Sequence, residues 1–201
     1  MEPAATPKPD PVHVLETTLR PPCVMTRGAG DLLFDEDGKR YLDFVQGWAV
    51  NSLGHAPPEV AHALTEQAGR LVHGSAGFFN TTQVKLSSTL CQQSGLDRVF
   101  LCSTGAEANE SAIKLARKWG QVARGGAWEI VTTTDAFHGR TLATMSASGK
   151  PGFDTMFRPQ VPGFPKARLN DLASVRALIG PQTVAVMLEP IQGEAGVIEA
   201  E

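Results

Sequence analysis

The chain has 201 residues, 42% of them hydrophobic, and a formal net charge of -3 at pH 7. This length can bury a substantial core, and the charge gives no electrostatic reason to expect nucleic acid or an anionic membrane as a partner. No apolar run reaches the roughly 18 residues of a membrane helix. The 3 cysteines form no C-x-x-C pair, which is typical of a reducing compartment. We therefore expect a cytoplasmic protein that binds no nucleic acid, membrane or metal.

The amino-terminal part predicts a tail, a helix and then antiparallel strands. Residues 1–11 are rich in proline and lack the apolar core of a secretory signal, so a flexible tail is expected there. A short helix is expected at 11–19. Between residues 23 and 44, short apolar runs alternate with Gly-rich turns, and the pair Asp37-Gly38 is a strong hairpin signal.

From residue 58 onward the pattern changes to helices that alternate with apolar strands. Pro58 at a first helical turn and the apolar spacing behind it predict one helix, and a second is expected at 81–94. Strands are expected at 98–103, 128–133 and 183–190, and helices from 104, after 139 and near 170–179. Strands without polar alternation that are separated by helices indicate a parallel sheet covered on both faces, so the fold class is α/β.

The stretch "STGAEANESAIKLAR" joins the first of these strands to a helix. Thr104 and Glu107 have the spacing of a capping box, which would make the stretch an ordinary helix start. Gly105 and Ala106, however, leave the helix start sterically open at the carboxyl end of a parallel strand, where free amides and the helix dipole favour a phosphate. Both interpretations stay open for this stretch alone. The apolar stripe expected to be buried behind it consists of Ala108, Ala112, Leu115, Ala116 and Trp119.

A second strand end, at residues 132–141, carries Phe137, His138 and Arg140. An aromatic ring beside a phosphate site suits a planar ligand, and a guanidinium suits a carboxylate through two parallel hydrogen bonds. Core packing of Phe137 and a surface position of Arg140 are the alternatives. His138 has no matching Asp or Ser arrangement, so we expect it to be structural.

A third strand end, at residues 187–196, carries Glu189 and Glu194. These two carboxylates could hold cations or gate a substrate, or they could be solvated loop acids. Three strand ends in succession, each with groups that suit one part of a phosphorylated ring cofactor, favour a ligand site over three unrelated loops.

These segments together resemble a known family. "STGAEANESAIKLAR", "FHGRT" and "EPIQGEAG" are similar to the class III pyridoxal-phosphate-dependent aminotransferases of fold type I, and "YLDFVQGWAVNSLGH" and "DLLFDEDGKRY" match their amino-terminal region. Within the family the acetylornithine aminotransferases are most similar. The resemblance implies that 12–56 is the amino-terminal part of a small domain with antiparallel strands. Residues 57–201 would then be the first part of the large cofactor-binding domain.

The resemblance also implies roles in binding pyridoxal 5'-phosphate. Gly105 and Ala106 would donate backbone amides to its phosphate, with Thr104 beside them, and Phe137 would stack on its pyridine ring. No residue of this sequence matches the family's Schiff-base lysine or the Asp-Glu-Val-Gln segment before it, so both are expected downstream. The segment therefore holds no catalytic residue of that kind, and we expect it to be inactive by itself.

For substrates, the resemblance implies that Arg140 binds the α-carboxylate. Glu194 would lie over the active site, where relatives use it to hold or release a second arginine. The implied reaction moves the δ-amino group of N-acetylornithine to 2-oxoglutarate, in arginine biosynthesis, within a homodimer. Trp48 stands where relatives often have a smaller residue, which leaves the substrate open. The alternatives are an ornithine, succinylornithine or other ω-amino-acid aminotransferase, or a non-catalytic, truncated aminotransferase-like module that binds a partner chain.

Overall fold

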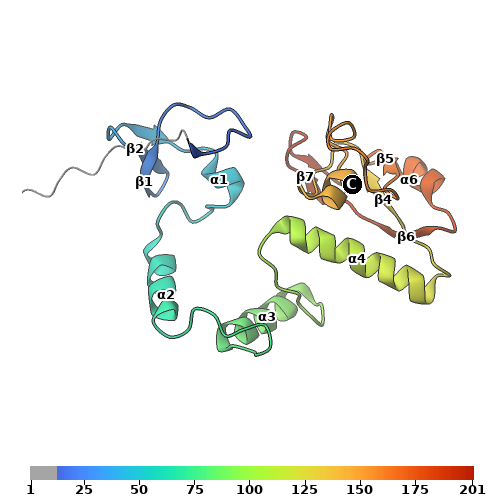
Figure 1. Cartoon of the computed structure of the whole chain (residues 1–201), viewed down its shortest axis with the longest axis horizontal. Coiled ribbons are helices and arrows are strands. Elements are labelled where there is room, and N and C mark those ends of the chain that lie inside the picture. The colour runs from blue at the N-terminus through green and yellow to red at the C-terminus, as the bar shows by residue number, and fades with distance from the viewer. Residues whose placement is uncertain (1–12) are drawn as a thin grey trace, which may run out of the picture. The chain divides into compact units, whose positions relative to one another are not determined.

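The computed structural model describes residues 13–201, so the tail expected at 1–11 lies outside the described residues. The chain divides into two compact units, the first ending at Lys85 and the second running from Leu86 to Glu201. Figure 1 shows the elements of each unit, and each unit is described by itself below. Within the described residues, no helix is long and apolar enough to cross a membrane.

The first unit begins with an antiparallel sheet, as the sequence predicts. Its strands are β1 (Met25–Ala29), β2 (Leu32–Asp35) and β3 (Arg40–Leu42), in the order β1-β2-β3. The buried Asp35 carboxylate closes the β2–β3 turn, since it accepts hydrogen bonds from the amides of Asp37 (3.0 Å) and Lys39 (2.9 Å). A third bond, from the Tyr41 hydroxyl at 2.8 Å, lowers the pKa of Asp35. Gly38, at φ 77°, supplies the left-handed residue of this hairpin.

The helix expected at 11–19 is wrong for the part that the structure describes. Residues 13–19 contain bends and no α-helix. Leu15 and Leu19 are 81% and 101% exposed, so this segment has no apolar surface to pack against. A helix this short is marginal in water without such packing.

Three helices follow in the first part of the chain. They are α1 (Gln46–Ala49), α2 (Pro58–Ala68) and α3 (Thr81–Ser94). The predictions of a helix from Pro58 and of another at 81–94 are confirmed. Neither α2 nor α3 has a buried residue, so the apolar side of each faces outward.

The second unit contains a parallel sheet, which confirms the α/β class. The strands β4 (Glu129–Thr133), β5 (Lys166–Ala167) and β6 (Thr183–Val186) pair in the order β5-β4-β6. Helix α4 (Gly105–Ala123) runs along the sheet and contacts β4, β6 and α5 (Leu142–Ala147), while α6 (Leu172–Leu178) contacts β5 (Figure 1). A short antiparallel hairpin, β7 (Ile191–Gln192) and β8 (Ile198–Glu199), follows β6.

The strand expected at 98–103 is wrong. This segment has no strand, and Phe100 and Leu101 are 70% and 38% exposed. A strand exists only where its amides and carbonyls pair with a neighbour. Among the described residues, no strand pairs with this segment.

Helix α4 also buries a different face from the one predicted. Its buried residues are Ile113 and Gly120, whereas Leu115 is 73% and Trp119 46% exposed. A Cβ on Gly120 would overlap the carbonyl oxygen of Ala127, so the glycine lets the helix backbone approach the next segment closely. Ile113 then packs in a buried cluster on the sheet, and Ala116 of the predicted stripe packs against it, whereas Leu115 and Trp119 face outward.

This packing gives a first prediction, Gly120→Ala. The added methyl group has no space against the Ala127 carbonyl, so the free energy of unfolding should fall by about 1–3 kcal/mol through overpacking. Chemical denaturation of the full-length protein measures the change. Gly180→Ala is the matched control, because a Cβ there meets no atom within 4 Å. Equal stability of the two variants would contradict the close approach.

Candidate functional site

The start of α4 is a capped helix end with an open side. The Thr104 hydroxyl accepts a hydrogen bond from the Glu107 amide at 3.1 Å, and the Glu107 carboxylate accepts one from the Thr104 amide at 3.1 Å. The predicted capping box is therefore confirmed. The next two amides, those of Gly105 and Ala106, point out of the first turn, where a helix has no partner of its own to offer them. A Cβ on Gly105 would meet no atom within 4 Å, so an anion has room to approach these amides.

The loop of the second motif docks directly on this helix start. A Cβ built on Gly139 would lie 2.9 Å from the Ala106 Cβ and 2.7 Å from the Thr144 hydroxyl oxygen, and Gly139 has φ 134°. Only glycine fits such a position. The Asn109 side chain of α4 donates a hydrogen bond to the His138 carbonyl at 2.7 Å. The contact thus joins the predicted phosphate and ring segments.

The third motif is joined to the second through Glu189. Its carboxylate accepts a hydrogen bond of 2.9 Å from the Phe137 amide. The half-buried Phe137 ring also meets the Phe153 ring edge-on, with 6.3 Å between their centroids. The sequence left the role of Glu189 open, and its position at a strand end was the only local signal for it.

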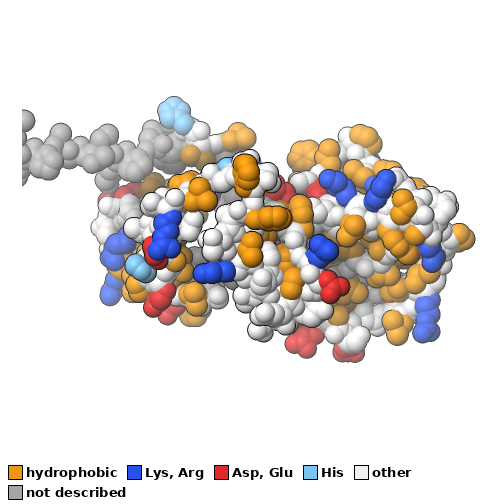
Figure 2. Space-filling view, turned by 90° about the horizontal axis from the view of Figure 1, so that it is seen from below, with side chains coloured by type: hydrophobic (Ala, Val, Ile, Leu, Met, Phe, Trp, Pro, Cys, Tyr) orange, Lys and Arg blue, Asp and Glu red, His pale blue; other side chains and the backbone are white. Residues whose placement is uncertain are grey.

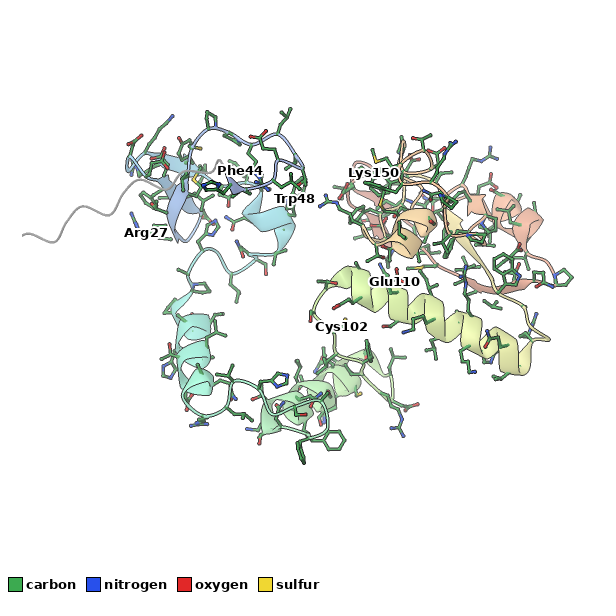
Figure 3. The ribbon with its side chains drawn as sticks, in the orientation of Figure 1. Arg27, Phe44, Trp48, Cys102, Glu110 and Lys150 are labelled. Atoms are coloured by element: carbon green, nitrogen blue, oxygen red, sulfur yellow. The ribbon has the colours of Figure 1, made fainter. Side chains whose placement is uncertain are left out.

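Two cationic groups lie near the Phe137 ring. The Arg140 guanidinium lies 5.8 Å and the Lys150 ammonium 5.7 Å from the centroid of its ring. Lys150, labelled in Figure 3, forms an ion pair with Glu194 in the β7–β8 hairpin. Arg140 is exposed and forms no ion pair with any described residue, so its guanidinium remains available to a carboxylate. Sequence analysis missed Lys150, because no local pattern distinguishes it from a surface lysine.

A cavity of about 490 Å³ lies beside Phe137, between α4 and the carboxyl end of β6. Phe137 and Glu189 are in its wall, together with apolar residues such as Ile113 and Met187. Mostly apolar walls with a few polar groups are typical of small-molecule sites. Among the described residues, no group of three or more His, Cys, Asp and Glu side chains could hold a metal ion.

His138 is buried, and the neighbouring Lys166 is half-buried. His138 is 4% exposed, its amide donates to the Ser148 hydroxyl at 2.8 Å, and burial and then the Lys166 charge lower its pKa. Lys166 donates to the Thr132 hydroxyl at 2.8 Å and to the Ser146 carbonyl at 2.7 Å, and burial lowers its pKa to about 8. His138 is therefore enclosed, and the structural role expected for it stays a prediction.

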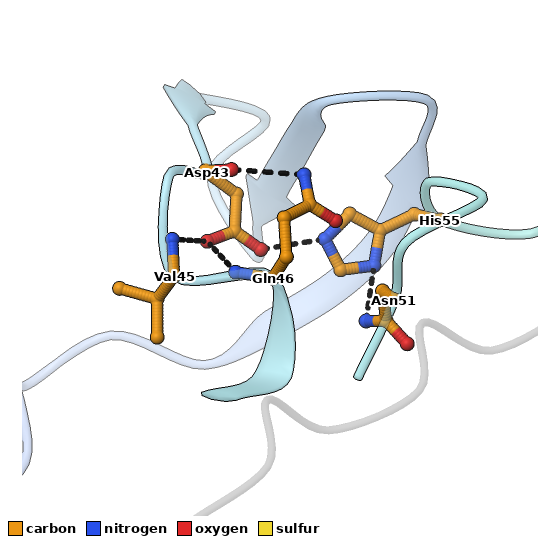
Figure 4. A network of polar contacts seen from close by, with 5 residues as sticks. All are labelled: Asp43, Val45, Gln46, Asn51 and His55. Atoms are coloured by element: carbon orange, nitrogen blue, oxygen red, sulfur yellow. Dashed lines mark hydrogen bonds and ion pairs between the residues drawn. The ribbon is translucent and has the colours of Figure 1, made fainter. Parts of the chain in front are cut away.

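The first unit contains a separate polar network around Asp43 (Figure 4). The Asp43 carboxylate accepts hydrogen bonds from the amides of Val45 (2.9 Å) and Gln46 (3.0 Å) and from the His55 ring at 2.7 Å. Hydrogen bonds from the Gln46 amide and then from His55 lower the pKa of Asp43. The network contains no hydroxyl or thiol group, so it is not a nucleophilic triad.

This network fixes a strained turn at α1. Four successive residues there have left-handed φ values, including Trp48 at 63° and Ala49 at 62°. Such a conformation costs roughly 1–2 kcal/mol for each residue with a side chain. The turn presents Trp48, which is 80% exposed and is labelled with Phe44 in Figure 3. Strain of this kind is typical of residues that contact a ligand or a partner.

Known proteins are similar to this chain over nearly its whole length. Residues 15–201 match the family model described as aminotransferase class-III. "Acetylornithine aminotransferase 2" of Bordetella bronchiseptica is 64% identical over 187 residues, which cover 93% of this chain and 47% of that protein. The acetylornithine aminotransferase of Methanocaldococcus jannaschii is 44% identical over 183 residues, covering 90% of this chain and 46% of that protein.

Solved structures of aminotransferases are also similar to this chain in fold. The ornithine aminotransferase of Toxoplasma gondii superimposes with a TM-score of 0.86 at 34% identity, covering 94% of this chain and 46% of that one. For the N-acetylornithine aminotransferase of Stenotrophomonas maltophilia the TM-score is 0.74 at 37% identity, with 90% and 44% covered. The chain thus spans about half the length of the curated relatives it matches. With a matching family model over nearly all of its residues, this chain belongs to the class-III aminotransferases and has their fold.

Proposed function

We propose that the protein is a pyridoxal-phosphate-dependent aminotransferase, and that this chain contributes the phosphate and ring ends of its cofactor site. The observation that carries the proposal is the docking of Gly139 on Ala106, because it brings the open helix start and the Phe137 ring to one place. The room at Gly105 for an anion and the apolar cavity beside Phe137 support the same assignment.

Each residue of the site would do one part of the binding. The amides of Gly105 and Ala106 hold the phosphate, and Phe137 packs on the pyridine ring. Arg140 binds the substrate α-carboxylate, which orients the bond to be broken relative to the ring. Glu194, paired with Lys150, borders this space. When bound, pyridoxal phosphate supplies the carbonyl carbon that takes up the amino group and a ring that stabilises negative charge.

The proposed substrates are N-acetylornithine, through its δ-amine, and 2-oxoglutarate, in arginine biosynthesis. The names of the curated relatives support this choice over ornithine and succinylornithine, and over a non-catalytic module. The free cysteines support a reducing, cytoplasmic location. We also propose residues 12–56 as part of a small domain and 57–201 as part of the large one.

We further propose that the protein is a homodimer. Large apolar side chains lie at the surface of the chain (Figure 2), and in the first unit Phe44 and Trp48 are 90% and 80% exposed. Exposed apolar groups of this kind usually mark an interface. Sedimentation of the full-length protein would give its oligomeric state.

The test of the function is transamination by the full-length protein. Incubation with pyridoxal phosphate should produce the absorption band of a bound cofactor, and with an amino donor present 2-oxoglutarate should be converted to glutamate. The value of kcat/KM should be higher with N-acetylornithine than with ornithine or N-succinylornithine. Cofactor binding without glutamate formation from any of these donors would overturn the proposed activity.

A further inference from the structure

One hydrogen bond ties the Phe137 backbone to a distant part of the chain. The Glu189 carboxylate, which follows β6, accepts the amide of Phe137 at 2.9 Å, although 52 positions separate the two residues. Both line the same cavity. The direction of the Phe137 ring is therefore coupled to the end of a strand of the sheet.

The rest of the loop is held by other elements. Asn109 of α4 binds the His138 carbonyl, and Ser148 after α5 binds the His138 amide. Neither contact reaches Phe137 itself. Rotation about the backbone between Phe137 and His138 could still turn the ring. Two hydrogen bonds on the peptide group between Ala136 and Phe137 resist this rotation: its carbonyl accepts from the Gly149 amide at 3.0 Å, and its N–H donates to Glu189.

Among the described residues, Glu189 has no cationic partner that would explain its position. It forms no ion pair with any described residue, and the nearby Lys150 is paired with Glu194. Its contact with Phe137 uses the carboxylate oxygen as an acceptor, and a neutral amide oxygen can accept the same bond. A substitution that keeps the acceptor oxygen but removes the negative charge can therefore show which of the two matters.

We propose that Glu189 is a positioning residue that holds the Phe137 ring in the orientation in which it packs on the cofactor ring. This inference rests on the proposed function, because it assumes that pyridoxal phosphate binds against Phe137. It assigns no catalytic role to Glu189. The acceptor oxygen is essential and the negative charge is not.

Three substitutions in the full-length protein test this. Glu189→Gln keeps an acceptor at the same reach, Glu189→Asp keeps the charge but shortens the reach, and Glu189→Ala loses both. Glu189→Asp and Glu189→Ala should bind pyridoxal phosphate about tenfold more weakly, the size expected for the loss of one hydrogen bond that orients the ring, whereas Glu189→Gln should stay within about threefold of the parent.

Two further readouts report on the ring and on the loop. Circular dichroism of the bound cofactor's absorption band depends on the orientation of its ring, and it should change in the Asp and Ala variants but not in the Gln variant. In the cofactor-free protein, hydrogen exchange at Phe137 should accelerate in the same two variants. Glu199→Ala, at an exposed position on β8, is the matched control and should leave all three measurements unchanged.

The outcomes separate the two proposals. Loss of affinity in Glu189→Gln as large as in Glu189→Asp would show that charge matters and would overturn the positioning role. Unchanged affinity, dichroism and exchange in all three variants would overturn it as well. If the parent protein binds no pyridoxal phosphate, the proposed function fails, whereas the exchange rates still decide whether Glu189 holds the loop. If Glu189→Ala does not fold, the comparison of Gln with Asp decides.

Discussion

Gly105→Val should reduce the affinity of the full-length protein for pyridoxal phosphate by about a hundredfold, since the loss of one or two charge-assisted hydrogen bonds has this size. The space that a side chain would fill at Gly105 is open, with no atom within 4 Å of an added Cβ. A branched side chain there would occupy the position from which an anion reaches the amides of Gly105 and Ala106. Absorbance titration of the cofactor-free variant with pyridoxal phosphate measures the affinity.

The control separates this effect from damage to the helix. Gly105→Ala adds one methyl group in the same open space, and alanine favours a helix over glycine by about 1 kcal/mol. This variant should be at least as stable as the parent in thermal denaturation, while its cofactor affinity falls less than that of Gly105→Val. If the valine variant bound pyridoxal phosphate as tightly as the parent protein, the phosphate would not bind at this helix start.

Features that depend on neighbouring residues could be predicted from the sequence. The β2–β3 hairpin at Asp37-Gly38 and the capping box of Thr104 and Glu107 form as expected, because each uses groups within a few positions of one another. The parallel sheet also follows from the alternation of apolar strands and helices.

Features that depend on residues far apart in the sequence could not be predicted in this way. The apolar stripe of α4 predicts that Leu115 and Trp119 are buried, yet the close contact of Gly120 with Ala127 turns another face to the sheet. The segment at 98–103 has the composition of a strand but finds no pairing partner among the described residues. The amino-acid composition of a segment shows which of its side chains could be buried, but the fold determines which of them face another element.

At the candidate site, too, the sequence predicts local features but not the contacts between distant residues. The sequence indicated Phe137, Arg140 and Glu194 from their positions at strand ends. In the structure, Arg140 and Lys150 both lie near the Phe137 ring, and Lys150 forms an ion pair with Glu194. The sequence could not indicate the hydrogen bond from the Phe137 amide to the Glu189 carboxylate, because that contact depends on the register of β6 beside β4. Strand ends therefore identify candidates, while the contacts among them come from the sheet.

Under the proposed function, Arg140→Lys in the full-length protein should lower kcat/KM for both the amino donor and 2-oxoglutarate by roughly one to two decades, because each would present its α-carboxylate to the same guanidinium. Two parallel hydrogen bonds need the planar fork of arginine, and lysine offers only a point charge. The exposed guanidinium, which has no ion-pair partner among the described residues, is free to make them.

Affinity for pyridoxal phosphate should barely change in this variant, because the Gly105 and Ala106 amides and the Phe137 ring are intact. Arg168→Lys is the matched control, since Arg168 is exposed and paired with Asp171, and it should leave the kinetics of both half-reactions unchanged. Steady-state kinetics with each substrate varied in turn decide between a ligand and a scaffold role. A loss of thermal stability with kcat/KM preserved for both substrates would mean that Arg140 supports the loop through its contact with the Phe137 ring, and that the substrate carboxylate binds elsewhere.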